Sequence, residues 1–244
     1  MKYLLLLFFS INLMTCSNED LPEELNTHLE GDLVISSAKD SDNATIKAFE
    51  SINGNLIIKN TYEMEDLSFL QNLKEVEGII IKDNKNLNSL KGLENIEEVT
   101  YIGIENNSEL TSLTGLDNLI TVSESFNIKN NDALPSLNAL NALTKIGGQF
   151  SIFDNRSLTT LNGLDNLLEV PQLLVTNNIN LTNINALGKI NSSADIRIDS
   201  NDSLADFCAL TTLIQANSET IAFIARFNLF NPTLEDMVNN NCSN

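Results

Sequence analysis

An internal repeat of 23 or 24 residues constrains the fold of this chain more than any other feature of its sequence. The repeat becomes visible when the sequence is aligned on seven apolar anchors, which are Met64, Leu87, Leu110, Leu134, Leu158, Leu181 and Leu204. Their successive spacings are 23, 23, 24, 24, 23 and 23 residues. After most anchors, further apolar residues follow at steps of three, which favours short 3₁₀-like or irregular turns over a long α-helix. A unit this short cannot bury a core by itself, so consecutive units must stack.

A short strand is predicted before each anchor. The positions eight and six residues before it are apolar in every repeat and flank a single residue, which is the period-two pattern of a half-buried strand. The pairs are Leu56/Ile58, Ile79/Ile81, Ile102/Ile104, Phe126/Ile128, Phe150/Ile152, Leu173/Val175 and Ile196/Ile198. Stacking brings these strands together as a parallel sheet with one strand per repeat. The sequence therefore predicts a fold of the α/β or mainly β class, a right-handed leucine-rich-repeat solenoid.

A polar residue recurs three positions before each anchor. It is Thr61 in the first repeat and asparagine in the six that follow, at Asn84, Asn107, Asn131, Asn155, Asn178 and Asn201. A buried amide at a corner can bond the backbone of its own turn and of the next repeat, so we expect a structural asparagine ladder. The alternative is a row of calcium ligands assisted by Asp83, Asp154 and Asp199, but no stretch matches a calcium-binding loop of the D-x-[DN]-x-[DN]-G type.

The repeat resembles a known family. The spacing is leucine-rich-repeat-like, and the element Ile52-Asn53-Gly54-Asn55-Leu56-Ile57-Ile58, repeated as Ile146-Gly147-Gly148-Gln149-Phe150-Ser151-Ile152, is similar to the receptor L domain. That domain is the ligand-binding solenoid of the insulin-receptor and epidermal-growth-factor-receptor ectodomains. Bacterial surface lipoproteins with this repeat are similar too. The resemblance covers about residues 30–215 and implies a fold; the disulfide-rich modules that flank the receptor domains are absent, so growth-factor binding is not implied.

The N-terminus has the features of an export signal. Lys2 precedes an apolar run from Leu4 to Met14, which is shorter than the roughly 20 residues that a membrane-spanning helix needs. The run ends at Leu13-Met14-Thr15-Cys16, which resembles the lipobox of bacterial lipoproteins, and the resemblance implies that Cys16 carries the lipid. The alternative is an ordinary cleaved signal with a coincidental cysteine. The acidic stretch after Cys16 resembles the export signals that carry some lipoproteins to the outer face of the Gram-negative outer membrane, or it is a plain solvated spacer.

Both ends of a repeat stack need caps, because the terminal repeats otherwise expose apolar surface. We expect a degenerate first repeat upstream, in which His28 is a cap or surface residue. Downstream, a cap ends in a short helix near 233–239, and an exported chain favours a disulfide between Cys208 and Cys242 over two free thiols. The predicted organisation is a signal peptide (1–15), a lipidated acidic tether (16–24), the repeat region with its N-terminal cap (25–215) and a C-terminal cap (216–244).

Composition excludes several classes of function. The chain of 244 residues carries 14 Lys and Arg against 33 Asp and Glu, a net charge of −19 that disfavours binding to nucleic-acid phosphates. One histidine and three cysteines leave little material for metal sites or Cys-His nucleophiles. No catalytic motif such as G-x-S-x-G or H-E-x-x-H occurs, and the carboxylates are spread along the repeats. We therefore expect a protein that is not an enzyme and needs no metal or cofactor.

The outward side of the predicted sheet is the candidate site, because its side chains are not needed for the core. Three lysines stand out in an acidic chain, and several apolar or aromatic residues accompany them. The predicted binding face comprises Ile57, Lys59, Ile80, Lys82, Tyr101, Glu105, Lys129, Phe153, Leu174 and Thr176. The alternative is that these residues are ordinary exposed positions of a sheet.

Two functions are consistent with these features. The first is a lipid-anchored binding protein on the surface of a Gram-negative outer membrane, whose sheet face recognises a protein or a glycan in adhesion or interaction. The second is a structural or accessory subunit of an outer-membrane complex without a ligand of its own.

Overall fold

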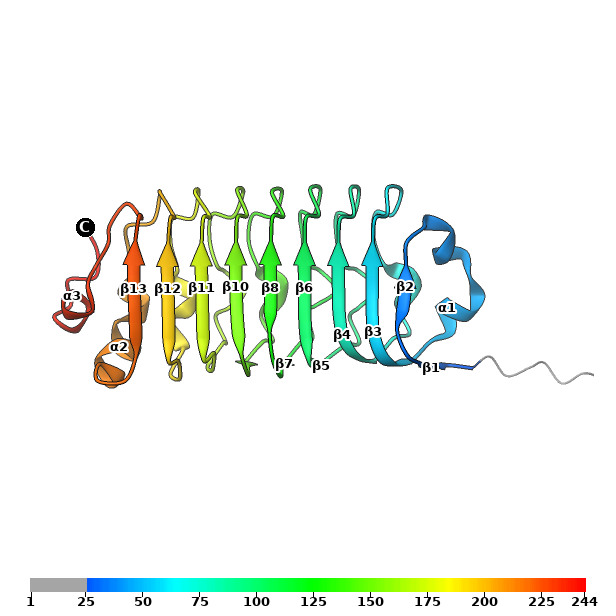
Figure 1. The fold of residues 1–244 in the computed structure, drawn as a ribbon, viewed down its shortest axis with the longest axis horizontal. Helices are drawn as coiled ribbons and strands as arrows, with labels where there is room; N and C mark the ends of the chain where they lie inside the picture. The colour runs from blue at the N-terminus through cyan, green and yellow to red at the C-terminus, as the bar shows by residue number, and fades with distance from the viewer. Residues whose placement is uncertain (1–25) are drawn as a thin grey trace, which may run out of the picture.

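The computed structural model describes residues 26–244, so the predicted signal peptide, Cys16 and the tether at 16–24 lie outside the described residues. Within this range, ten strands form one parallel sheet that runs the length of an elongated molecule (Figure 1). Nine strands follow one another along it in the order β1-β3-β4-β6-β8-β10-β11-β12-β13, and β2 also pairs with β3. The chain is thus a mostly parallel β structure, as the repeat predicts.

Seven strands of the main sheet, from β3 to β12, occur at the positions that the period-two pattern indicates, and β1, β2 and β13 extend the sheet beyond them. The ten strands are β1 (His28–Glu30), β2 (Leu33–Ile35), β3 (Ser51–Lys59), β4 (Glu75–Lys82), β6 (Tyr101–Glu105), β8 (Phe126–Lys129), β10 (Gln149–Phe153), β11 (Gln172–Thr176), β12 (Asp195–Asp199) and β13 (Ala222–Arg226). Corresponding residues of successive repeats stand in register, as in Leu56↔Ile79 and Ile79↔Ile102. A second, three-stranded sheet joins β5 (Glu98–Val99), β7 (Thr121–Val122) and β9 (Lys145–Ile146).

The returns between strands are short and irregular. Four contain a single 3₁₀ turn, at η2 (Ser68–Leu70), η3 (Asn138–Leu140), η4 (Asn185–Lys189) and η5 (Cys208–Leu210). Their apolar residues at steps of three point inward, and the six anchor leucines from Leu87 to Leu204 are fully buried, with Met64 only 5% exposed. The strand residues Phe126 and Phe150 stack in this core, with ring centroids 5.1 Å apart. One continuous apolar core therefore runs beneath the whole sheet.

Glycine permits the returns to stack closely at three places. Gly92, Gly115 and Gly163 have φ between +111° and +115°, a backbone conformation that L-residues rarely adopt. A Cβ atom on Gly163 would lie 1.8 Å from the carbonyl oxygen of Leu137 in the preceding repeat. These positions therefore need glycine both for their conformation and for the approach of the neighbouring backbone.

The N-terminal end is covered by β1, β2, a 3₁₀ segment η1 (Ala38–Asp42) and the short helix α1 (Ala44–Ala48). His28 is exposed, and its Nδ1 lies 2.5 Å from the hydroxyl oxygen of Ser51.

The C-terminal end differs from the boundary at residue 215 that the repeat spacing predicts. After helix α2 (Thr211–Asn217), the chain returns to the main sheet as β13 before it forms helix α3 (Leu234–Val238). Strands β12 and β13 pair in register with an offset of 27 residues, as in Asp195↔Ala222, so this repeat is longer than the others and escapes a search at 23 or 24.

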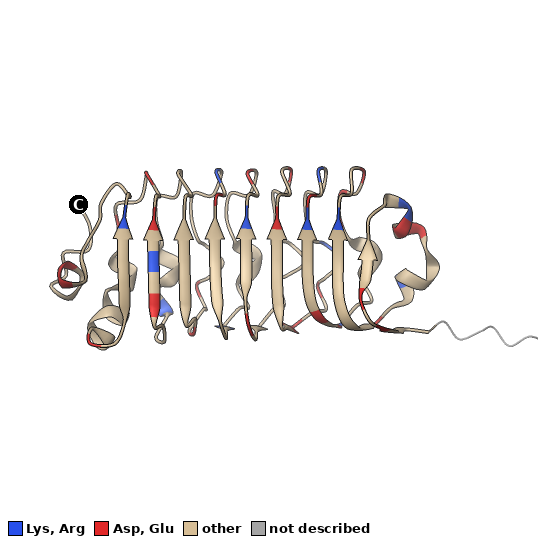
Figure 2. Ribbon diagram, in the orientation of Figure 1, with Lys and Arg blue, Asp and Glu red and all other residues tan. Residues whose placement is uncertain are grey.

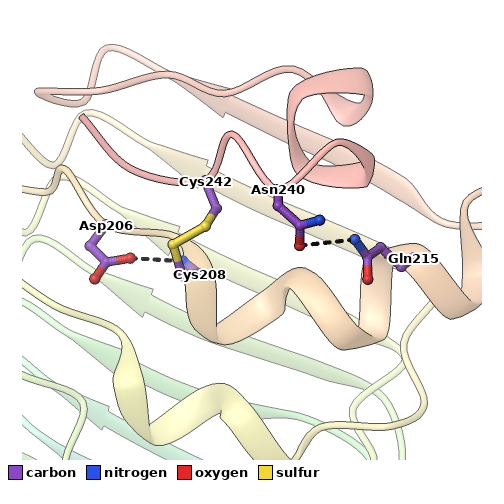
Figure 3. Close-up of a disulfide and its surroundings, with 5 residues drawn as sticks. All are labelled: Asp206, Cys208, Gln215, Asn240 and Cys242. Carbon is purple, nitrogen blue, oxygen red and sulfur yellow. Dashed lines mark hydrogen bonds between the residues drawn. A yellow bond between two sulfur atoms is a disulfide. The ribbon is translucent and has the colours of Figure 1, made fainter.

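The predicted disulfide is confirmed. Cys208 and Cys242 are bonded, with their Cα atoms 4.8 Å apart, and tie the segment after α3 to the last return. Figure 3 shows two hydrogen bonds beside it: the Cys208 amide donates to the Asp206 carboxylate at 2.8 Å, and Gln215 donates to the side chain of Asn240 at 3.1 Å. The C-terminal segment is thereby fixed against α2 and the end of the core.

Candidate binding face

The six asparagines of the predicted ladder lie at the turn that follows each strand, and each is fully buried. In Asn131, the side-chain nitrogen donates to the carbonyl oxygens of Ile104 at 2.9 Å and Lys129 at 3.1 Å. Its side-chain oxygen accepts from the backbone and side-chain nitrogens of Asn107, at 3.1 and 3.2 Å. Each amide therefore joins neighbouring repeats, and it holds the end of every strand at a fixed place.

The row of buried amides is longer than the repeat spacing predicts. Asn201 donates to the side-chain oxygen of Asn228 at 3.1 Å, and the Asn228 amide in turn bonds the carbonyl oxygen of Ile198 at 2.8 Å. Asn228 is only 8% exposed. The signal was present in the sequence as an asparagine two residues beyond β13, but the longer last repeat conceals it.

A second row of residues stands beside the buried amides, on the solvent side of the same turns. These residues all have left-handed backbones, with φ between 54° and 59°; they are Asn60, Asp83, Asn106, Asn130, Asp154, Asn177 and Ser200. Asn and Asp tolerate this conformation better than other side-chain-bearing residues, which explains their recurrence here. We call this set the left-handed row.

One contact in the left-handed row lacks a donor. Asn106 donates to Asp83 and Asn130 donates to Asn106, both at 2.9 Å, while Asn177 donates to Asp154 at 3.0 Å. The oxygen of Asn130 is buried and has no hydrogen-bond partner among the described residues. Asn106 and Asn130 are the two amides between the carboxylates of Asp83 and Asp154. The three contacts between neighbours in this stretch therefore share only two amide donors.

The outer face of the main sheet, which points away from the core, holds all ten residues of the predicted binding face. Those in the middle of the strands, such as Ile57, Ile80 and Leu174, are partly buried by their neighbours and are less exposed than the alternation alone suggests. Gly103 holds the mid-strand outward position of β6, in register with Ile80 on β4. A Cβ atom added there would meet nothing within 4 Å. The centre of the outer face is therefore open at β6.

Tyr101 is more constrained than the sequence indicates. Its hydroxyl donates to the side-chain oxygen of Asn55, two strands away, at 2.7 Å. The ring crosses Gly78, where a Cβ atom would lie 2.5 Å from the ring. Partial burial raises the pKa of Tyr101, and the carboxylates Asp32, Glu77 and Glu124 act in the same direction. Tyr101 is thus a fixed, protonated bridge at one border of the face.

Polar residues that the sequence reasoning did not select form a chain at the start of β10 to β12. Gln149 donates to Gln172 at 2.9 Å, Gln172 donates to Asp195 at 3.0 Å, and Arg197 forms an ion pair with Asp195 at 3.0 Å. Partial burial acts to raise the pKa of Asp195, but hydrogen bonds from Arg197 and Gln172 outweigh it and lower the pKa overall. Counting outward positions on every strand would have found these residues.

The last outward position of each strand forms a continuous row across eight strands, which we call the strand-end row. It comprises Lys59, Lys82, Glu105, Lys129, Phe153, Thr176, Asp199 and Arg226, and each residue stands in register with the next. Figure 2 shows it as blue tips on β3, β4, β8 and β13 and red tips on β6 and β12. The Lys129 ammonium lies 5.5 Å from the centroid of the Phe153 ring. The row combines positive charge with an aromatic surface.

Between residues 26 and 244, no group of three or more His, Cys, Asp or Glu side chains is placed to hold a metal ion. Over the same range, no helix has the length and hydropathy to cross a membrane.

The family comparison agrees with the repeat. A family model described as Receptor L domain matches residues 27–115, which extend from β1 to the return after β6. No curated protein matches the chain. The resemblance to the receptor L domain, a ligand-binding domain, is thereby confirmed for this part of the sequence.

Proposed function

We propose that this protein is a lipid-anchored binding protein of the Gram-negative outer-membrane surface, which uses the outer face of its sheet to recognise a protein or a glycan. In this proposal the repeats form a right-handed solenoid, Cys16 carries the lipid, and the role is adhesion or interaction without catalysis or a cofactor. The observation that carries the proposal is the outer face itself, together with the match of residues 27–115 to a ligand-binding domain.

The inward and outward residues of each strand have different roles. The inward residues of every strand are buried in one core, so they hold the fold. The outward residues differ from repeat to repeat although the backbone does not, and repeat proteins use such faces for binding. The face is also wide enough for a macromolecule, because nine strands follow one another across the sheet and neighbouring strands lie about 4.8 Å apart.

Gly103 offers a direct test of the face. Gly103→Trp adds a large side chain at the open centre of the sheet, where its Cβ atom would meet nothing within 4 Å. Asn86→Trp adds the same side chain at an exposed position off the sheet. Full-chain protein in detergent is applied to an array of matrix proteins, glycans and cell-envelope components. We expect discrete binding that Gly103→Trp abolishes and Asn86→Trp retains. Equal binding by the two variants contradicts recognition by the outer face.

The alternative role as an accessory subunit predicts a different outcome. In that case the wild-type protein binds nothing on the array, and it co-purifies with other membrane proteins whether or not Gly103 is replaced.

The anchor has a separate test. Cys16→Ala is expected to abolish metabolic lipid labelling, and protease added to intact cells is expected to digest the wild-type protein. Protection from that protease would place the protein on the periplasmic side instead.

A further inference from the structure

We infer that the N-terminal half of the strand-end row binds an acidic polysaccharide, one that carries carboxylate or sulfate groups. This inference rests on the proposed function, because it names the ligand class of the same face. It depends on the residues Lys59, Lys82, Glu105, Lys129 and Phe153.

The first observation is a pair of like charges in register. Lys59 and Lys82 are direct neighbours on β3 and β4. Four other pairs of charged residues stand in register between neighbouring chain segments, and all four join opposite charges; they are Lys82↔Glu105, Glu105↔Lys129, Asp199↔Arg226 and Lys145↔Glu169. Like charges directly opposite each other destabilise a sheet. The Lys59–Lys82 pair therefore costs stability that the fold avoids elsewhere.

The second observation is that these lysines have no ion-pair partner in the part of the chain that the structure describes. Ion pairs there use Lys74, Lys145, Arg156, Arg197 and Arg226, and none uses Lys59, Lys82 or Lys129. At the other end of the row, Asp199 pairs with Arg226 at 3.3 Å. Glu105 stands in register with Lys82 and Lys129, but among the described residues it forms no ion pair with either. Their ammonium groups remain available to an anion from outside.

The third observation is the aromatic neighbour. Phe153 is partly exposed, and the Lys129 ammonium is held 5.5 Å from its ring centroid. The C–H face of a sugar ring packs on an aromatic ring, while a nearby ammonium binds a carboxylate or sulfate on the same sugar. This combination favours an acidic sugar over an acidic peptide, whose carboxylates need no flat aromatic surface.

The geometry suits a polymer. Lys59 and Lys129 are separated by three strand spacings, about 14 Å. The open position at Gly103 lies beside the middle of this stretch. A chain of sugars lying across the strands would therefore meet Lys59 and Lys82 first. Beyond Glu105 it would meet Lys129 and then the Phe153 ring.

The experiment compares two triple variants with the same change in net charge. Lys59, Lys82 and Lys129 are replaced together by glutamine, and the control replaces the exposed Lys39, Lys91 and Lys189 in the same way. Binding of the full-chain protein in detergent is measured against immobilised heparin, polygalacturonate, neutral dextran and poly-glutamate at several salt concentrations. We expect binding to heparin or polygalacturonate that weakens with salt. It should fall roughly tenfold or more in the first variant, and it should stay within about twofold of wild type in the control.

Two single variants sharpen the test. Glu105→Gln removes the one acid between the lysines and should tighten binding several-fold, whereas the exposed control Glu109→Gln should not. Phe153→Ala should weaken binding to the polysaccharide and leave any binding to poly-glutamate unchanged.

Several results would overturn the inference. One is the absence of binding to either acidic polysaccharide, and another is an equal loss of binding in the two triple variants. A third is an affinity for poly-glutamate equal to that for the polysaccharide and unchanged by Phe153→Ala. If Gly103→Trp abolishes binding to another ligand while the three-lysine variant does not, the outer face keeps its proposed function and the acidic polysaccharide is rejected. If Gly103→Trp has no effect on any ligand, the proposed function itself fails.

Discussion

Replacing Asp154 with asparagine is expected to stabilise the protein, although most substitutions destabilise. The left-handed row has three contacts but only two amide donors between Asp83 and Asp154, and the buried oxygen of Asn130 has no partner among the described residues. An amide at position 154 supplies the missing donor. Asparagine also suits the backbone there, because φ is 57° and Asn readily adopts this conformation.

The magnitude follows from the cost of an unpaired buried acceptor. A net hydrogen bond contributes about 0.5 to 1.5 kcal/mol. Asp154→Asn should therefore raise the free energy of unfolding by about 1 kcal/mol and the Tm by roughly 2 to 4 °C for a chain of this size. Urea denaturation and calorimetry measure both quantities.

Two controls separate the hydrogen bond from the charge. Asp202→Asn removes one negative charge at an exposed position of the same acidic protein, so it measures the relief of general repulsion. Asn130→Asp removes the donor to Asn106 and places two carboxylates side by side, so it should destabilise. If Asp154→Asn gains no more stability than Asp202→Asn, the interpretation of the left-handed row is refuted.

Four other substitutions or conditions test the fold, each with its own measurement. Asn131→Ala should lower the free energy of unfolding by about 3 to 5 kcal/mol in urea denaturation, because it leaves buried groups of two repeats unpaired. A loss below about 1 kcal/mol would contradict the structural role of the Asn131 amide. Replacing both Cys208 and Cys242 with serine should lower the free energy of unfolding in urea by about 4 kcal/mol, by the chain-entropy relation for a separation of 34 residues. An unchanged stability would show that the C-terminal cap does not need the disulfide. Gly163→Ala should lower the Tm, since its Cβ would lie 1.8 Å from a carbonyl oxygen, whereas Ala at the exposed Gly188 should change it little. A hydrogen bond from the Thr233 hydroxyl lowers the pKa of Asp236 at the start of α3. The stability that the Asp236 carboxylate gives the helix is therefore present above the ordinary carboxyl pKa of about 4 and is lost as the pH falls. Amide exchange in α3 should accelerate on acidification, and it should do so less in Asp236→Asn.

The sequence predicts the inner half of this protein well because the repeat is enforced by the core. A residue that faces the core in one repeat faces it in the next, so the apolar pairs and the anchors can be aligned by counting. The buried amides obey the same rule, since each must bond the backbone of the neighbouring repeat. The strands from β3 to β12 and the strand-end row as far as Asp199 follow from that alignment.

The features that were missed depend on departures from the period. Strand β13 and Asn228 follow a repeat of 27 residues in which α2 lengthens the return after η5, so a fixed spacing passes over them. The bridge from Tyr101 to Asn55 depends on contact across two strands and on the absence of a side chain at Gly78. The unpaired oxygen of Asn130 arises from the order of amides and carboxylates along a row, which becomes meaningful only when their contacts are known.

Departures of this kind also indicate where function is to be sought. Because the same backbone recurs in each repeat, the fold makes the same demand on each outward position, and differences between repeats reflect something other than folding. The register pair Lys59–Lys82 is such a difference: an acidic chain that pairs opposite charges elsewhere in its sheets sets two lysines side by side here. Stability alone does not explain that choice, since a glutamate at position 59 would stand opposite Lys82 and improve the sheet. An external anion does explain it, because the repulsion between the two ammonium groups is relieved when the anion binds.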